Sequence, residues 1–188
     1  RQVVKGINFE DIVDAGDPAE AAQRYDEEGA DEICMLDIDA SYEARSTTLE
    51  TVEKIANQVF IPFTVGGGIK TVNDVEVLLK SGADKVSINT SAIINPNLIK
   101  EASKEFGSQC IVVAIDAKFN GENWSVYTHG GKNKTDLDAL SWSKEVEQLG
   151  AGEILMTSMD KDGTKSVFEN NLNSSLAEKL NIQLIDSG

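Results

Sequence analysis

The segment Gly82-Ala83-Asp84-Lys85-Val86-Ser87-Ile88-Asn89 decides the fold, because its pattern recurs twice along the chain. Each copy starts at a glycine that ends an amphipathic stretch, and each runs into a short apolar segment. The other copies are Gly29-Ala30-Asp31-Glu32 before Ile33-Cys34-Met35-Leu36-Asp37, and Gly150-Ala151-Gly152-Glu153 before Ile154-Leu155-Met156-Thr157. A helix stopped by glycine and followed by a short strand, repeated along a chain, is typical of a (βα) barrel. Barrel enzymes keep their chemistry at the ends of the strands, where this chain places polar residues.

Six short apolar runs predict the strands, and they are continuous, as expected for parallel strands that are covered on both faces. They are Ile33–Ile38, Ile61–Val65, Lys85–Asn89, Cys110–Ile115, Glu153–Thr157 and Gln183–Ile185. The opening residues Arg1–Gly6 look more like a loop than a strand, and Ser187-Gly188 stand at the top of a strand with no helix to follow. We therefore interpret residues 1–188 as one α/β domain, a (βα)8 TIM barrel that lacks the first strand and the eighth βα unit.

Capping residues predict where the helices begin. Asp17-Pro18-Ala19-Glu20 supplies an N-cap, a proline and a capping-box glutamate, and Thr71-x-x-Asp74 is a second capping box. Asn95-Pro96 opens a further helix that Gly107 ends. After the strand Cys110–Ile115, the segment Lys118–Val126 contains an Asn-Gly turn and predicts an inserted β-hairpin.

Composition restricts the partners. The formal charge of −15 over 188 residues argues against nucleic acid or an anionic membrane surface as the main partner, but backbone N–H groups could still hold a small phosphorylated ligand. No apolar run is long enough to span a membrane and no signal peptide opens the chain, so we expect a cytoplasmic protein. Cys34 and Cys110 lie in apolar strand patterns, which predicts small buried thiols rather than a disulfide or metal site.

Asp116 is the main candidate for catalysis. It ends the strand Cys110–Ile115, the fifth strand of a complete barrel, so its carboxylate should lie at the mouth of the barrel, where a carboxylate can move a proton to or from a heterocycle. A capping or salt-bridged aspartate is the structural alternative. Asp37, at the end of another strand, could equally be structural, and His129, the single histidine, lacks the partners of a metal site or a triad.

Two neighbouring strand ends predict a phosphate site. Gly66-Gly67-Gly68 would let backbone N–H groups approach phosphate oxygens, and Asn89-Thr90 would add amide and hydroxyl donors. A triple glycine alone could be a plain turn, and the polar pair one strand later strengthens the phosphate interpretation.

Charged residues occupy the opposite ends of three strands. Glu32, Lys85 and Glu153 begin the second, fourth and sixth barrel strands in the same relative position. Alternate strands contribute to one layer of a barrel interior, so the three side chains should meet. A surface salt-bridge cluster is the alternative.

Six motifs in order resemble the cyclase subunit of imidazole glycerol phosphate synthase over nearly the whole chain. The motifs are Val3–Gly6, Leu36–Ser41, Phe63–Ile69, Gly82–Thr90, Val112–Lys118 and Asp160–Ser166. The isomerase one step earlier in histidine biosynthesis shares the fold, but Ser87-Ile88-Asn89-Thr90 and the Asp116-Ala117-Lys118 hairpin fit the cyclase better.

The resemblance implies a synthase half of a glutamine amidotransferase, a lyase without cofactor or metal. It would use ammonia from a partner glutaminase docked at the N-terminal face of the barrel. Its doubly phosphorylated substrate would be the phosphoribulosyl-formimino-aminoimidazole carboxamide ribonucleotide, and its products imidazole glycerol phosphate and an aminoimidazole carboxamide ribotide. We expect no nucleic acid and no membrane as partner.

The same resemblance assigns roles residue by residue. Asp116 is the catalytic acid, working against a second aspartate on a first strand that is not among these residues. Glu32, Lys85 and Glu153 form a charged ring that gates ammonia. The residues expected to bind substrate or its phosphates are Lys5, Gly68, Asn89, Thr90, Thr157, Asp162, Gly163, Ser187 and Gly188.

Three departures from the family pattern keep alternatives open. Val167-Phe168 replaces a usual Gly-Tyr, Gly130 stands where serine is common, and Asp186 replaces a small apolar residue beside Ser187. One alternative is a paralogous ammonia-using synthase for another phosphorylated or nucleotide-sugar substrate. The other, from a different class, is an inactive barrel fragment that only docks the glutaminase.

Overall fold

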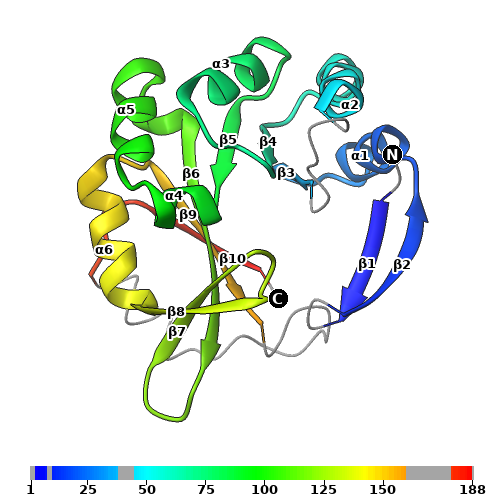
Figure 1. Ribbon diagram of the computed structural model, residues 1–188. Helices are drawn as coiled ribbons and strands as arrows, with labels where there is room; N and C mark the ends of the chain where they lie inside the picture. Colours follow the sequence, from blue (N-terminus) through cyan, green and yellow to red (C-terminus); the bar gives the residue numbers. More distant parts are fainter. Residues whose placement is uncertain (1–2, 8–9, 38–44, 160–178, 188) are drawn as a thin grey trace.

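Six parallel strands form a curved sheet that makes part of a barrel wall (Figure 1). The computed structural model describes residues 3–7, 10–37, 45–159 and 179–187. The strand order is β3-β4-β5-β6-β9-β10, and every pair along this path is parallel. The strands are β3 (Ile33–Leu36), β4 (Phe63–Gly66), β5 (Lys85–Ile88), β6 (Ile111–Phe119), β9 (Glu153–Ser158) and β10 (Gln183–Ser187). The fold class predicted from the repeats, a partial (βα)8 barrel, is confirmed.

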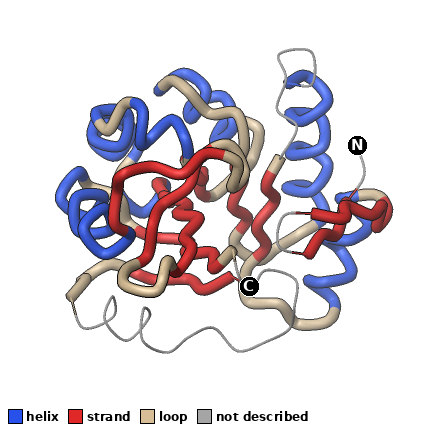
Figure 2. The backbone as a smooth tube through the Cα atoms, turned by 60° about the horizontal axis from the view of Figure 1, so that its bottom comes forward, coloured by secondary structure: helices blue, strands red, loops and turns tan. Residues whose placement is uncertain are grey.

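Helices cover the convex side of this sheet, as both views show (Figures 1 and 2). They are α1 (Pro18–Glu27), α2 (Arg45–Gln58), α3 (Val72–Lys80), α4 (Thr90–Ile94), α5 (Asn97–Phe106) and α6 (Ala139–Leu149), with the 3-10 turn η2 (Ser108–Cys110). The main core lies between helices and sheet, where outward-facing strand residues such as Val86, Val113 and Ile154 are fully buried. Because α-helical and strand faces both lose apolar surface there, this layer supplies most of the burial that holds the fold together.

The helix ends follow the predicted capping chemistry. Asp17 accepts hydrogen bonds from the backbone N–H groups of Ala19 and Glu20. Thr71 and Asp74 form the reciprocal capping box at the start of α3. Gly150 ends α6 in the left-handed conformation, with φ of 103°. The short helix α4, directly after β5, was not predicted.

The N-terminal residues differ from the prediction. The opening segment was expected to be a loop, but β1 (Val3–Ile7) pairs antiparallel with β2 (Glu10–Gly16) in a separate two-stranded sheet. Hydrogen bonds between the two backbones hold this ribbon, and such bonds do not depend on an apolar run of the kind that marks the barrel strands. In Figure 1 the ribbon stands beside α1, at the end of the arc opposite α6.

The predicted hairpin is present and is longer than expected. Beyond the parallel region, β6 continues and pairs antiparallel with β7 (Trp124–Thr128), which pairs with β8 (Asn133–Asp138). Asp116 therefore lies within β6 rather than at its end. It pairs with Thr157 of β9 on one side and with Tyr127 of β7 on the other. The carboxylate thus sits where the parallel sheet changes into the hairpin.

Candidate functional site

Three polar residues lie in register on neighbouring strands, near the place where the parallel pairing of β6 and β9 ends. Asp116 of β6 pairs with Thr157 of β9, and Thr157 pairs with Ser187 of β10. Asp116 is 6% exposed and Thr157 8% exposed. Side chains in register on adjacent parallel strands project from the same face of the sheet. The structure therefore brings together three of the residues that the sequence predicted for the mouth of the barrel.

Asn89 connects this row to β5. Its Nδ2 donates a hydrogen bond of 2.9 Å to Asp116 Oδ2. Its Oδ1 is buried and has no hydrogen-bond partner among the described residues. Asn89 was expected to bind phosphate, and the structure gives its amide a different contact, to the candidate catalytic carboxylate. The orphan oxygen needs a donor, since a buried polar atom without a partner costs free energy.

Thr90, the next residue, faces a different neighbour. Its Oγ1 accepts a hydrogen bond of 2.9 Å from the backbone N–H of His129, in the turn between β7 and β8. Sequence reasoning missed this contact. The only local signal was the Gly130-Gly131 pair, which indicates a turn without saying what the turn touches.

Packing explains two of the three glycines predicted to bind phosphate. A Cβ at Gly66 would lie 2.7 Å from Leu36 Cδ2 and 2.9 Å from Ser87 Cβ. A Cβ at Gly67, where φ is 108°, would collide with the carbonyl oxygen of Asp37. Close approach of two strand ends therefore requires both glycines. Gly68 also has a positive φ, 66°, a backbone conformation that favours glycine.

Asp37 links the end of β3 to β4 and α2. Its Oδ2 accepts a hydrogen bond of 2.8 Å from Thr48 Oγ1 on α2, and its N–H donates to the carbonyl of Gly66. These contacts join β3, β4 and α2, which favours the structural alternative for Asp37.

The charged residues at the amino ends of the strands do meet. Lys85 Nζ donates to both oxygens of Glu32, at 3.0 and 2.9 Å, and to Glu153 Oε2 at 2.6 Å. The exposed side-chain fractions are 18% for Lys85, 21% for Glu32 and 5% for Glu153. We call Glu32, Lys85 and Glu153 the charged ring. Glu153 is buried, whereas Lys85 and Glu32 remain partly exposed, so the charged ring lies at the edge of the hollow side of the sheet.

Thr64 contacts the charged ring, and the two carboxylates of the ring change the pKa of Lys85. Thr64 Oγ1 donates to Glu32 Oε1 at 2.7 Å, while Glu153 Oε1 is buried without a hydrogen-bond partner among the described residues. Desolvation alone would lower the pKa of Lys85, but its hydrogen bonds to Glu153 and Glu32 outweigh this effect and raise that pKa above 10.5. One cation between two carboxylates leaves an excess negative charge.

An inner cavity of about 110 Å³ lies beside the charged ring, lined by Glu32, Cys34, Thr64, Val112, Glu153, Leu155 and Ile185. Cys34 was expected to be buried, and this is wrong, because its side chain faces the hollow side of the sheet. The atoms crowding the thiol still desolvate it. Together with the negative charges of Glu32 and Glu153, and against the opposing charge of Lys85, this raises the pKa of Cys34 to about 12. Cys110 is half-buried, and both cysteines are free thiols.

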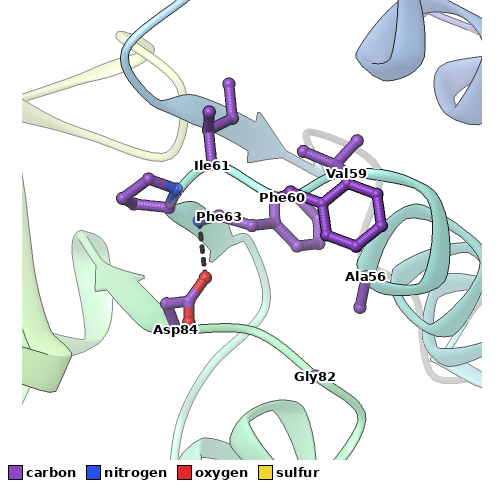
Figure 3. A pocket seen from close by; sticks show the side chains of 8 residues that line it. Ala56, Val59, Phe60, Ile61, Phe63, Gly82 and Asp84 are labelled. Carbon is purple, nitrogen blue, oxygen red and sulfur yellow. Dashed lines mark hydrogen bonds between the residues drawn. The ribbon is translucent and has the colours of Figure 1, made fainter. Parts of the chain in front are cut away.

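A second cavity, of about 300 Å³, lies at the amino end of β4 (Figure 3). Ala56, Val59, Phe60, Ile61, Pro62, Phe63, Gly82 and Asp84 line it. Asp84 Oδ2 accepts a hydrogen bond of 2.8 Å from the Phe63 N–H and so joins the starts of β4 and β5. Phe60 is 91% exposed. Phe60 is therefore available for contact with another molecule at this end of the sheet.

Some of the predicted site residues are not described by the structure, or only their backbone is described. Asp162, Gly163 and Gly188 lie outside the described residues, and for Lys5 only the backbone, in β1, is described. Asp186 pairs with Met156, one residue before Ser187, so it faces away from the row that contains Ser187. Within the described ranges no cluster of His, Cys, Asp or Glu could hold a metal ion, and no helix could cross a membrane.

Parallel strands with polar residues at their carboxyl ends and helices outside define a barrel-type α/β enzyme. Comparison with protein families identifies the family of this enzyme. A family model described as "Histidine biosynthesis protein" matches residues 1–188, and the chain belongs to this family. It is a histidine-biosynthesis barrel enzyme of the isomerase or cyclase type.

Proposed function

We propose that this chain is the cyclase subunit of imidazole glycerol phosphate synthase. The observation that carries the proposal is the charged ring of Glu32, Lys85 and Glu153, which meets at the end of the strands opposite Asp116 with Glu153 buried. Removing a charge from water is costly, and Glu153 is buried with Oε1 lacking a hydrogen-bond partner among the described residues, which favours a functional role for the charged ring. A cyclase that receives ammonia from a partner needs a polar passage at this end, whereas an isomerase that rearranges one bound substrate does not.

Asp116 is the proposed catalytic acid. It is almost completely buried, lies in register with Thr157, and accepts a hydrogen bond from Asn89. A carboxyl group held in one orientation by a neutral amide is well placed, when protonated, to donate its proton to a heterocycle. Thr157 and Ser187 are the proposed polar contacts for the substrate on the adjacent strands.

Phosphate groups at both ends of the substrate are the proposed ligands of the loops around this row. Gly68 and Thr90 would bind one phosphate, with Asn89 between that phosphate and Asp116. Gly163, Ser187 and Gly188 would bind the other phosphate, Asp162 would line the substrate pocket with Thr157, and Lys5 would close over the substrate. The position of Asp186 on the opposite face of β10 supports the same substrate, because it keeps this extra acid away from Ser187.

A glutaminase subunit is the proposed partner, docked at the amino ends of the strands. Two observations support this surface: the charged ring opens at this end, and the exposed Phe60 stands there beside a cavity of about 300 Å³. The proposed location is the cytoplasm.

The test uses the full-length protein with its glutaminase. Purified protein should form imidazole glycerol phosphate from the open ribonucleotide with ammonium salt alone, and from glutamine only when the glutaminase is added. Conversion of the preceding ribosyl compound into that open ribonucleotide, without cyclisation, would instead identify the isomerase. Binding of the glutaminase without any turnover would identify the docking fragment.

A further inference from the structure

The turn between β7 and β8 has an unusual backbone. His129, Gly130 and Gly131 follow one another with φ of 55°, 63° and 80°. His129 is the non-glycine residue with positive φ among the described residues. The left-handed region is disfavoured for residues with a side chain, and such strain concentrates at functional positions.

The strained residue makes a specific contact 39 positions away in the sequence. The backbone N–H of His129 donates to Thr90 Oγ1 at 2.9 Å. A threonine hydroxyl has one proton and two acceptor lone pairs. When its oxygen accepts from a fixed N–H, its own proton is available to donate, which is the orientation that a phosphate oxygen requires.

Side-chain contacts hold the turn in this shape. His129 Nδ1 lies 3.2 Å from Asn133 Nδ2 and 3.1 Å from Thr128 Oγ1. Because the amide nitrogen of Asn133 can only donate, Nδ1 acts as the acceptor there. The imidazole thus braces the hairpin, and the contact with Thr90 is made by the backbone.

The same hairpin is fixed to the catalytic row. Tyr127, two residues before His129, pairs with Asp116, and Asp116 accepts from Asn89. The junction of β5 and α4 is therefore attached to β6 and its hairpin through two adjacent residues, Asn89 and Thr90. Displacing the turn would release the second attachment and leave the first in place.

We propose that His129 is a positioning residue for the phosphate site: its left-handed backbone holds Thr90 Oγ1 so that the hydroxyl proton points to the ligand. The inference rests on the proposed phosphate-binding role of Thr90. If His129 has this role, the affinity for the phosphate group depends on whether the residue at position 129 tolerates positive φ, and not on the imidazole as an acid or base.

The test compares His129→Gly, His129→Asn and His129→Val in the full-length enzyme. Glycine and asparagine accept positive φ, whereas valine does not. With ammonium salt as nitrogen source, His129→Val should raise KM about three- to tenfold, the loss of one net hydrogen bond, with kcat nearly unchanged. Glycine and asparagine should rescue KM. Thermal stabilisation by inorganic phosphate gives a second readout and should weaken by the same factor in the valine variant only.

The outcomes separate the inference from the proposed function. Equal losses in the glycine and valine variants would overturn the inference, because the affinity would then depend on the imidazole, through its contacts with Thr128 and Asn133 or with the ligand, and not on the backbone conformation. A valine variant with the wild-type KM would also overturn it. If His129→Val does not fold, His129→Ala takes its place, with a smaller rise in KM expected. Thr90→Val is the reference variant. Unchanged phosphate affinity in this variant would contradict the proposed phosphate site itself. A loss of affinity in Thr90→Val without a loss in the position-129 variants would contradict only the positioning role of His129.

Discussion

The side-chain amide of Asn89 donates to Asp116 Oδ2 at 2.9 Å, so the residue after β5 orients the carboxylate in the middle of β6. The two positions are 27 residues apart, and they meet because β5 and β6 are adjacent parallel strands. This contact divides the proposed site into an acid half, Asn89 with Asp116, and a phosphate half around Thr90. Mutations in the two halves should therefore have different kinetic signatures.

Asp116→Asn should abolish cyclisation with ammonium salt and leave substrate binding nearly intact. The carboxylate is expected to act in the transition state, where loss of a general acid costs about 10²–10⁴ in rate. Steady-state kinetics and a direct binding titration together measure the two effects. Turnover near that of the wild type would remove Asp116 from the mechanism.

Asn89→Ala should mainly lower kcat, because Asp116 would lose the donor that orients it. A buried hydrogen bond to a charged group contributes about 1.5–3 kcal/mol, so a loss of about ten- to a hundredfold in kcat is expected. Thr90→Ala is the matched comparison and should mainly raise KM. If both variants change KM equally and leave kcat unchanged, Asn89 is a simple phosphate ligand and its contact with Asp116 has no catalytic consequence.

Lys85→Ala should change the coupling between glutamine hydrolysis and product formation in the complex with the glutaminase. Ammonium ions added to the solution supply ammonia directly to the open mouth, so the activity with external salt should change much less. The quantity to measure is the ratio of the two activities. Lys80→Ala removes an exposed lysine of α3 that pairs with Glu76 and serves as control. Equal effects of Lys85→Ala on both ammonia sources would leave the charged ring with a structural role only.

The charged ring should also contribute a pH-dependent part of the stability. The pKa of Lys85 is raised in the folded state above 10.5, so the stabilisation is complete below the unfolded-state value and is lost as pH rises through the folded-state value. Lys85→Met should cost about 3 kcal/mol near neutral pH, since it strands two largely buried carboxylates. Urea denaturation of both proteins should show this gap to be constant from about pH 7 to about pH 10 and smaller above. A gap that widens with rising pH would contradict the assignment.

Cys34 should be unreactive in the folded protein. With a pKa of about 12, against an ordinary thiol value of 9.0, its thiolate fraction at neutral pH is lower by about a thousandfold. Alkylation by iodoacetamide in a Cys110→Ser background should be slower by a similar factor and should recover on unfolding. Fast modification of the folded protein would show that desolvation and the neighbouring carboxylates do not raise the pKa of this thiol.

The sequence predicted the strands and the charged ring because both depend on simple periodicity. The glycine before each strand predicts where β3, β5 and β9 begin, at Ile33, Lys85 and Glu153, and residues an even number apart share a face. The capping motifs at Asp17 and Thr71 were equally local, so α1 and α3 start where they were predicted.

Contacts between strands were not predictable in the same way. The bond from Asn89 to Asp116 depends on the stagger between β5 and β6, where Ser87 pairs with Val112, and no single sequence fixes that stagger. The left-handed backbone of His129 depends on a contact with Thr90 formed only after the hairpin folds back. The packing roles of Gly66 and Gly67 likewise need the neighbouring strand in place.

The tip of the hairpin that follows Asp116 is a suitable position for an insertion or a label. Its tip, residues 120–123, is exposed, and Asn120 closes it locally by accepting hydrogen bonds from the N–H groups of Glu122 and Asn123. The ladder from Asp116 to Phe119 lies between this tip and the catalytic row. New chain ends or an inserted reporter domain at the tip should therefore be tolerated, since exposed loop tips accept such changes when the backbone behind them stays paired. That makes the tip a suitable position for a fluorescent label that reports on the mouth of the barrel without touching it.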